Sequence, residues 1–173
     1  MPAFEESCAR DRDALRALAE DAREQLLDAA SREDAYSPAL ADQRGELGLL
    51  YAKLCNHPAA LDEYRKALHA IRVSDGLLSK SQLPYLRALA ESYRAIGDFE
   101  SAQKSLQQAF RIHGFGREEL SEQALADSLA YFQLARELYT HPSRQGTTFL
   151  FFEAYQDTRA MLDAQRARDL AFA

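Results

Sequence analysis

The sequence contains few residues that interrupt helices. Of its 173 residues only 7 are glycine and 5 are proline. It also lacks runs in which valine, isoleucine or threonine alternate with polar residues, and this absence excludes a protein built mainly from β-sheets. With 47% hydrophobic and 28% charged residues, the composition is that of an ordinary globular protein. We therefore expect an all-α fold.

Three further absences narrow the function. The net charge is −6, and there is no basic stripe of the kind that binds nucleic acid, so we expect no nucleic-acid partner. No stretch approaches the ~18 apolar residues of a membrane span, so we expect no membrane insertion. The first residues, Met-Pro-Ala-Phe-Glu-Glu, lack the basic and apolar segments of a secretion signal. The expected location is the cytoplasm, and earlier removal of a leader stays open as an alternative.

Residues that could carry chemistry are scarce and scattered. The two cysteines, Cys8 and Cys55, match no metal-binding or disulfide spacing. We expect both to be buried as small apolar side chains in a reducing compartment. None of the four histidines forms a convincing metal-binding pair at helical spacing. Neither a nucleophile motif nor a phosphate-binding loop is present. The sequence therefore predicts no metal, no cofactor and no enzyme activity.

Local signals divide the chain into seven helices. Ser37-Pro38 is typical of a helix start, and Asn56-His57-Pro58 and Gly97-Asp98 are typical of breaks between helices. The predicted helices span about 4–30, 38–54, 58–73, 82–96, 99–113, 118–139 and 148–169. The first of them has a stripe of apolar residues with charged residues around it, and the stripe contains Leu18 and Leu26.

A pattern of small and aromatic residues appears twice, 42 residues apart. The first copy reads Leu47-Gly48-x-x-Tyr51, followed by Ala60, Tyr64 and Ala67. The second copy reads Leu89-Ala90-x-x-Tyr93, followed by Gly97-x-Phe99, Ala102, Leu106 and Ala109. Small residues allow two helices to approach closely, and the aromatic residues fill the wider gaps. Repetition at this period predicts a stack of antiparallel helix pairs.

This pattern resembles the tetratricopeptide repeat (TPR), with Leu-Gly/Ala-x-x-Tyr in one helix and Gly-x-Tyr/Phe-x-x-Ala in the next. The first copy departs from it at Cys55, in place of the glycine between the helices, and at His57, in place of an aromatic residue. The long period resembles the long-linker repeats of kinesin light chains and of many bacterial repeat proteins. The resemblance implies a right-handed α-solenoid that forms a single domain over residues 1–173. Its expected parts are an N-terminal half-repeat (1–36), two repeats (37–77 and 78–116) and a divergent C-terminal helix pair (117–173).

The resemblance also implies a concave groove that is lined by the first helix of each pair and holds a peptide or protein. Alignment with the groove positions of the family gives Gly45, Leu49, Ala52, Lys53, Arg87, Glu91, Arg94, Ala95, Gln123, Asp127, Ala130 and Tyr131. Arg87, Glu91 and Arg94 share one helix face, where they either pair with one another or clamp a carboxylate of the partner. The function implied is a non-catalytic protein interaction scaffold.

The apolar run Phe149-Leu150-Phe151-Phe152 predicts a second surface. Consecutive apolar residues at the start of a helix cannot all face one core. Phe149, Phe151 and Phe152 therefore either cover the end of the array or form a homodimer interface. The alternative function is a structural, homo-oligomeric subunit that associates through this helix.

Overall fold

The computed structural model describes residues 12–113, 121–140, 156, 159–160 and 163. The chain divides into two compact units, Met1–Asp98 and Phe99–Ala173, and each is described here by itself. Every regular element within the described ranges is a helix, which confirms the all-α fold class. The helix predicted over about 148–169 lies mostly outside the described residues; where the structure describes it, at 156, 159–160 and 163, the chain is helical.

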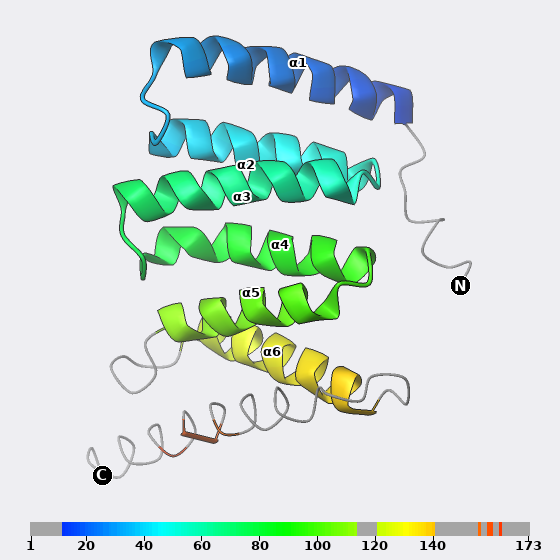
Figure 1. Ribbon diagram of the computed structural model, residues 1–173, viewed down its shortest axis with the longest axis vertical. Helices are drawn as coiled ribbons and strands as arrows, with labels where there is room; N and C mark the ends of the chain where they lie inside the picture. Colours follow the sequence, from blue (N-terminus) through cyan, green and yellow to red (C-terminus); the bar gives the residue numbers. More distant parts are fainter. Residues whose placement is uncertain (1–11, 114–120, 141–155, 157–158, 161–162, 164–173) are drawn as a thin grey trace. The chain divides into compact units, whose positions relative to one another are not determined.

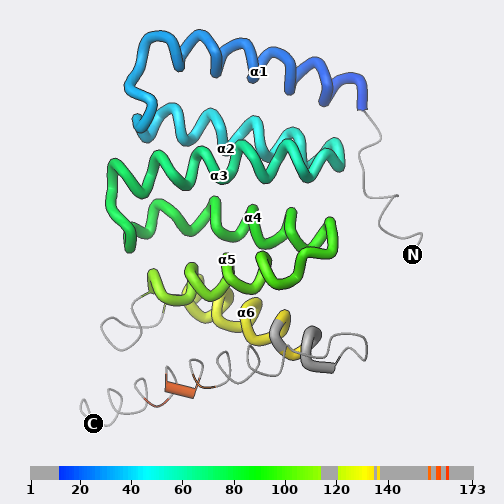
Figure 2. Tube along the Cα trace, in the orientation of Figure 1, coloured from blue at the N-terminus to red at the C-terminus, as the bar shows by residue number. Residues whose placement is uncertain are grey.

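The first unit contains four α-helices in its described part. They are α1 (Arg12–Arg32), α2 (Pro38–Lys53), α3 (His57–Ser74) and α4 (Leu83–Ala95), with a short 3₁₀ helix, η2 (Lys80–Gln82), before α4. Within this unit α1 packs against α2, α2 against α3 and α3 against α4, and the two helices of each pair run antiparallel (Figures 1 and 2). In the second unit α5 (Phe99–Ile112) packs against α6 (Glu122–Thr140).

Polar side chains cap the starts of α2 and α3, and of these the sequence predicted Ser37. The Ser37 hydroxyl accepts a hydrogen bond of 3.1 Å from the backbone N–H of Leu40, and Pro38 occupies the first turn of α2. The Asn56 side chain accepts one of 3.4 Å from the N–H of Ala59 at the start of α3. A side-chain acceptor at this position satisfies an N–H group that has no partner within the helix. The sequence therefore sets both helix starts locally.

The α1–α2 contact is a small apolar core. Ala19 and Leu26 of α1 are buried together with Leu40 and Leu47 of α2. Leu18, which the apolar stripe of the sequence placed on the buried face, is instead 54% exposed. That prediction was wrong because Ala19, one position further along the helix, faces α2 in its place.

The small residues of the repeat lie where the pattern predicts. Ala60 and Ala67 of α3 and Ala102 and Ala109 of α5 are all fully buried. Within α2, Gly48 lies against the Tyr64 ring so closely that a Cβ at this position would be 2.6 Å from Cε1 of the tyrosine. The missing side chain therefore lets α2 and α3 approach each other.

The turn at Cys55 has the same backbone form as the turn at Gly97. Cys55 has a φ of 59° and Gly97 a φ of 80°, both in the left-handed region that favours glycine. The Cys55 N–H donates to the carbonyl of Ala52 at 2.9 Å, and the Gly97 N–H donates to that of Arg94 at 3.0 Å. The first repeat therefore makes the turn of the family with a cysteine in the place of the glycine.

Cys55 also corrects the prediction made for the cysteines. It is exposed, not buried, at the turn between α2 and α3. It is also disulfide-bonded, although its position relative to Cys8 matched no disulfide spacing. Cys8 lies outside the described residues.

Candidate functional site

An open cavity of about 640 Å³ lies between α2 and α4, across α3. We call it the α2–α4 groove. Helix α2 contributes Pro38, Asp42, Gly45, Glu46 and Leu49, which share one helix face at spacings of three and four. The remaining lining residues are Tyr64, Ile71, Asp75, Ser81, Pro84, Tyr85 and Ala88. Rigid helices thus form its sides and its floor.

Tyr85 links the two sides of the groove. Its hydroxyl donates a hydrogen bond of 2.7 Å to Oδ1 of Asp42. Its ring lies against Gly45, where a Cβ would be 2.8 Å from Cε1 of the tyrosine. The glycine is therefore needed for the ring to reach α2, and the bond to Asp42 holds the ring there.

The charge of the groove is negative. Its lining includes the carboxylates of Asp42, Glu46 and Asp75, and none of the described lining residues is lysine, arginine or histidine. Hydrogen bonds from Ser74, at 2.8 Å, and from Ser81 lower the pKa of Asp75, which keeps this carboxylate ionised.

The two tyrosines of the groove have pKa values above the ordinary one, mainly because both are buried. Burial, the hydrogen bond to Asp42 and the charges of Asp42 and Asp75 raise the pKa of Tyr85 above its ordinary value. Burial and the charge of Glu91 raise the pKa of Tyr64 to about 12. Both phenols therefore stay protonated at neutral pH, in a surrounding that disfavours further negative charge.

Part of the groove predicted from the family lines this cavity. Gly45 and Leu49 do so, and Leu49 is 49% exposed. Lys53 is exposed at the end of α2, outside the described lining. The sequence did not single out Asp42, Glu46, Asp75 or Tyr85. For Asp42 and Glu46 the sequence did contain a signal, because both share a face of α2 with Leu49 at helical spacing.

The charged stripe of α4 lies beside this cavity and does not line it. Helix α4 presents Pro84, Tyr85 and Ala88 to the groove. Glu91 and Arg94 are exposed and Arg87 is half-buried. Helical geometry places Arg87 and Arg94 on a different side of α4 from Ala88. The interpretation of this stripe as a clamp for a carboxylate therefore has no support from the lining of the groove.

In the second unit the structure corrects two predicted groove positions. Asp127 and Tyr131 are buried, 3% and 0% exposed, because they face α5. Asp127 Oδ2 lies 2.7 Å from Nε2 of His113, and the Tyr131 ring centre lies 5.5 Å from that of Phe110. Gln123 is exposed. The interface predicted for Phe149, Phe151 and Phe152 lies outside the described residues.

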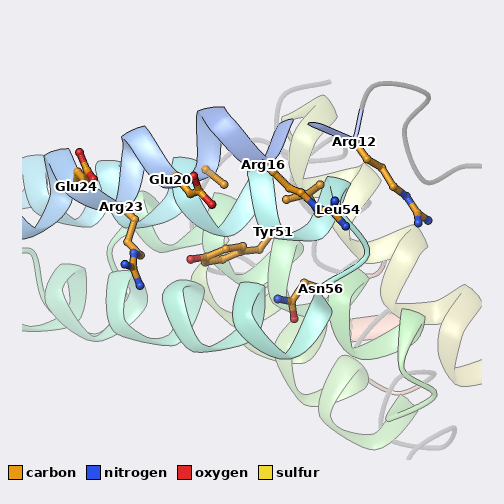
Figure 3. Close-up of a pocket in the computed structure, with 9 residues that line it drawn as sticks. Arg12, Arg16, Glu20, Arg23, Glu24, Tyr51, Leu54 and Asn56 are labelled. Carbon is orange, nitrogen blue, oxygen red and sulfur yellow. The ribbon is translucent and has the colours of Figure 1, made fainter. Parts of the chain in front are cut away.

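A second cavity of about 640 Å³ lies between α1 and the turn that joins α2 to α3. Figure 3 shows arginine and glutamate side chains of α1 along it, with Tyr51 of α2 below them. Its lining includes three arginines, Arg12, Arg16 and Arg23, and two glutamates, Glu20 and Glu24. Acidic and basic groups are mixed in this cavity, so it favours neither sign of charge as clearly as the α2–α4 groove does.

The described residues lack the features of two other kinds of site. They contain no group of three or more histidine, cysteine, aspartate or glutamate side chains that could hold a metal ion. Among their helices, none combines the length and the apolar character that crossing a membrane requires.

Comparison with known proteins supports the fold. Residues 43–113 match the family model of the tetratricopeptide repeat. BtubC (BKLC) from P. vanneervenii superposes with a TM-score of 0.65 and 17% identity, over 91% of this chain and 59% of BtubC. The TPR-like repeats of a kinesin light chain from Podosopora anserina superpose with a TM-score of 0.62 and 18% identity, over 91% of this chain and 89% of that one.

These matches confirm the stacked helix pairs predicted from the repeated pattern. This chain spans 59% of the length of BtubC, which is less than two thirds of it. No curated protein matches the sequence.

Proposed function

Because the chain is a tetratricopeptide repeat protein, with repeats matched over residues 43–113, we propose that it is a non-catalytic scaffold that binds a segment of a partner protein in the α2–α4 groove. Proteins of this family generally mediate contacts between proteins and generally lack catalytic activity. The proposal assigns that general role to one surface of this chain.

The main observation that supports the proposal is the groove itself. Its volume of about 640 Å³ falls within the range of roughly 300–1,000 Å³ that is usual for ligand sites. Its sides are first helices of two successive pairs, α2 and α4, and its floor is α3. A site on rigid helices loses little conformational freedom when a partner binds, which favours affinity.

The test fills the groove and measures the capture of partners. Ala88 lines the groove, and it is only half-buried, so Ala88→Trp places an indole in the cavity. The matched control is Ala39→Trp, at an exposed position of α2 outside the described lining. The immobilised full chain and both variants are incubated with native lysate of the source cells, and the retained proteins are compared by mass spectrometry.

We expect the wild type and Ala39→Trp to retain the same partner and Ala88→Trp to lose it. Circular dichroism spectra of the three proteins confirm that each is folded. Equal retention by Ala88→Trp and the wild type would place the binding surface elsewhere on the chain.

A further inference from the structure

The α2–α4 groove combines negative charge with exposed apolar surface. Its carboxylates come from two sides, Asp42 and Glu46 from α2 and Asp75 from the end of α3. An acidic ligand would have to lose hydration while it approached these like charges, and this cost has no compensation within the lining. A cationic ligand would gain from the same arrangement.

The three carboxylates of the groove differ in the hydrogen bonds that they already accept. Asp42 accepts the Tyr85 hydroxyl through Oδ1, which leaves Oδ2 for a ligand. Asp75 accepts from Ser74 and Ser81, and these bonds favour its charged form. Glu46 is exposed on the groove face of α2. Glu46 is therefore the carboxylate that a ligand reaches at the least cost to the fold.

Exposed leucines lie in the lining of the groove and on the connection that follows α3. Leu49 is 49% exposed at one end of the α2 face of the groove. Leu77 and Leu78, each 71% exposed, lie on the connection between Asp75 and Ser81, both of which line the groove. Exposed leucines next to a charged groove favour a ligand that buries apolar groups as well as charge.

Arginine and lysine side chains match both properties. Their methylene stems pack on apolar surface, while the charged group at the tip reaches a carboxylate. Apolar neighbours of such a side chain in the partner would cover the exposed leucines. The expectation from the sequence, an acidic partner, depended on Arg87 and Arg94, and neither is among the described lining residues.

We propose that the α2–α4 groove binds a partner segment in which arginine or lysine side chains stand next to apolar ones, with the cationic groups paired to Glu46, Asp42 and Asp75. This inference rests on the proposed function, since it names the chemistry of the partner for the same groove. It commits the site to a basic and apolar peptide.

The test uses three fluorescein-labelled peptides of equal length. One alternates leucine with arginine, and the other two carry glutamate or glutamine in place of every arginine. Fluorescence anisotropy measures the binding of each peptide to the full chain and to Glu46→Lys, Glu46→Gln and Ala88→Trp. The matched control is Glu24→Lys, which makes the same change of charge in the second cavity, outside the groove.

We expect the arginine peptide to bind at least about tenfold more tightly than the glutamine peptide, and the glutamate peptide to bind more weakly than both. Glu46→Lys should lower the affinity for the arginine peptide at least about tenfold, and Glu46→Gln should lower it by less. Glu24→Lys should leave this affinity within about twofold of the wild-type value. Added salt should reduce the difference between the arginine and glutamine peptides.

The outcomes separate this inference from the proposed function. Loss of binding in Ala88→Trp, together with equal affinity for the three peptides, would keep the groove as the site and overturn its preference for cations. Equal affinity for the three peptides, together with unchanged binding by Ala88→Trp, would overturn both proposals. Absence of binding by all three peptides, or wild-type self-association that Glu46→Lys abolishes, would overturn the basic peptide as the occupant.

Discussion

The Tyr85 hydroxyl donates a hydrogen bond of 2.7 Å to Oδ1 of Asp42, a residue 43 positions earlier in the chain. The bond joins α4 to α2 across α3, at one side of the α2–α4 groove. The ring also lies against Gly45, so this tyrosine contacts both Asp42 and Gly45 on the α2 side of the groove. The same contact therefore contributes to stability and to the shape of the site.

Tyr85→Phe keeps the ring and removes the hydrogen bond. We expect the free energy of unfolding to fall by about 1–2 kcal/mol, because the acceptor is a charged group that is only partly withdrawn from water. Urea denaturation followed by circular dichroism measures this change. Tyr36→Phe, which removes the hydroxyl of a half-exposed tyrosine, is the control. Equal stability of Tyr85→Phe and the wild type would show that water satisfies Asp42 as well as the tyrosine does.

Gly48→Ala tests the closest approach of α2 and α3. The added Cβ would lie 2.6 Å from Cε1 and 2.8 Å from Cδ1 of the buried Tyr64 ring, so the ring must move. Overpacking of this kind costs about 1–3 kcal/mol, and the better helix propensity of alanine offsets up to about 1 kcal/mol of it. With the full offset, we expect a net loss of up to about 2 kcal/mol in the free energy of unfolding.

The contribution of helix propensity to the stability of Gly48→Ala can be measured in the same helix. Glu46 is exposed in the middle of α2. The difference in stability between Glu46→Gly and Glu46→Ala therefore gives the stabilisation that alanine provides over glycine in this helix, without a clash with Tyr64. If Gly48→Ala raised the free energy of unfolding by as much as Glu46→Ala exceeds Glu46→Gly, the result would contradict the close contact with Tyr64.

The stability of the first unit should fall at alkaline pH. Burial and Glu91 raise the pKa of Tyr64 to about 12, above the ordinary value of 10.0. The folded chain therefore holds this proton at pH values where the unfolded chain has lost it. The resulting stabilisation is complete below about pH 10 and is lost as the pH rises from there through about 12.

Urea denaturation at a series of pH values between about 8 and 12 measures this loss, which is on the order of 2 kcal/mol for such a shift. Tyr64→Phe should reduce the slope of stability against pH in this window, and Tyr36→Phe should not. A slope that Tyr64→Phe leaves unchanged would assign the loss to other groups, such as Tyr85, whose pKa is raised as well.

The sequence predicted those features that depend on neighbouring residues in the chain. The start of α2 at Ser37-Pro38 follows from capping alone, and the buried positions of Ala102 and Ala109 follow from helical spacing. The left-handed turn at Cys55 was harder to recognise, because only its alignment with Gly97 indicates a backbone form that cysteine seldom adopts.

The face of α4 that lines the groove could not be read from spacing. In α4 the residues that line it, Pro84 and Ala88, and the charged pair Arg87 and Arg94 both recur at helical intervals. A rotation of α4 about its axis by about a quarter turn would exchange one set for the other at the groove. The contacts of Tyr85 with Gly45 and Asp42 place one face of α4 at the groove, and these contacts join residues from two different repeats.

The pair formed by His113 and Asp127 explains why Asp127 is not a groove residue, and it predicts a large effect on stability. The two side chains are 6% and 5% exposed, with Nε2 of the histidine 2.7 Å from Oδ2 of the aspartate. Asp127→Ala leaves the imidazole buried without this acceptor, and loss of a hydrogen-bond partner from a buried polar group costs about 1–3 kcal/mol. The control, Glu100→Ala, removes a partner of Lys104 from an ion pair that is about two-thirds exposed and should cost less than about 1 kcal/mol. Thermal and urea denaturation of the two variants measure the difference. A stable Asp127→Ala protein with weakened capture of the partner would instead return Asp127 to the binding surface that the sequence predicted.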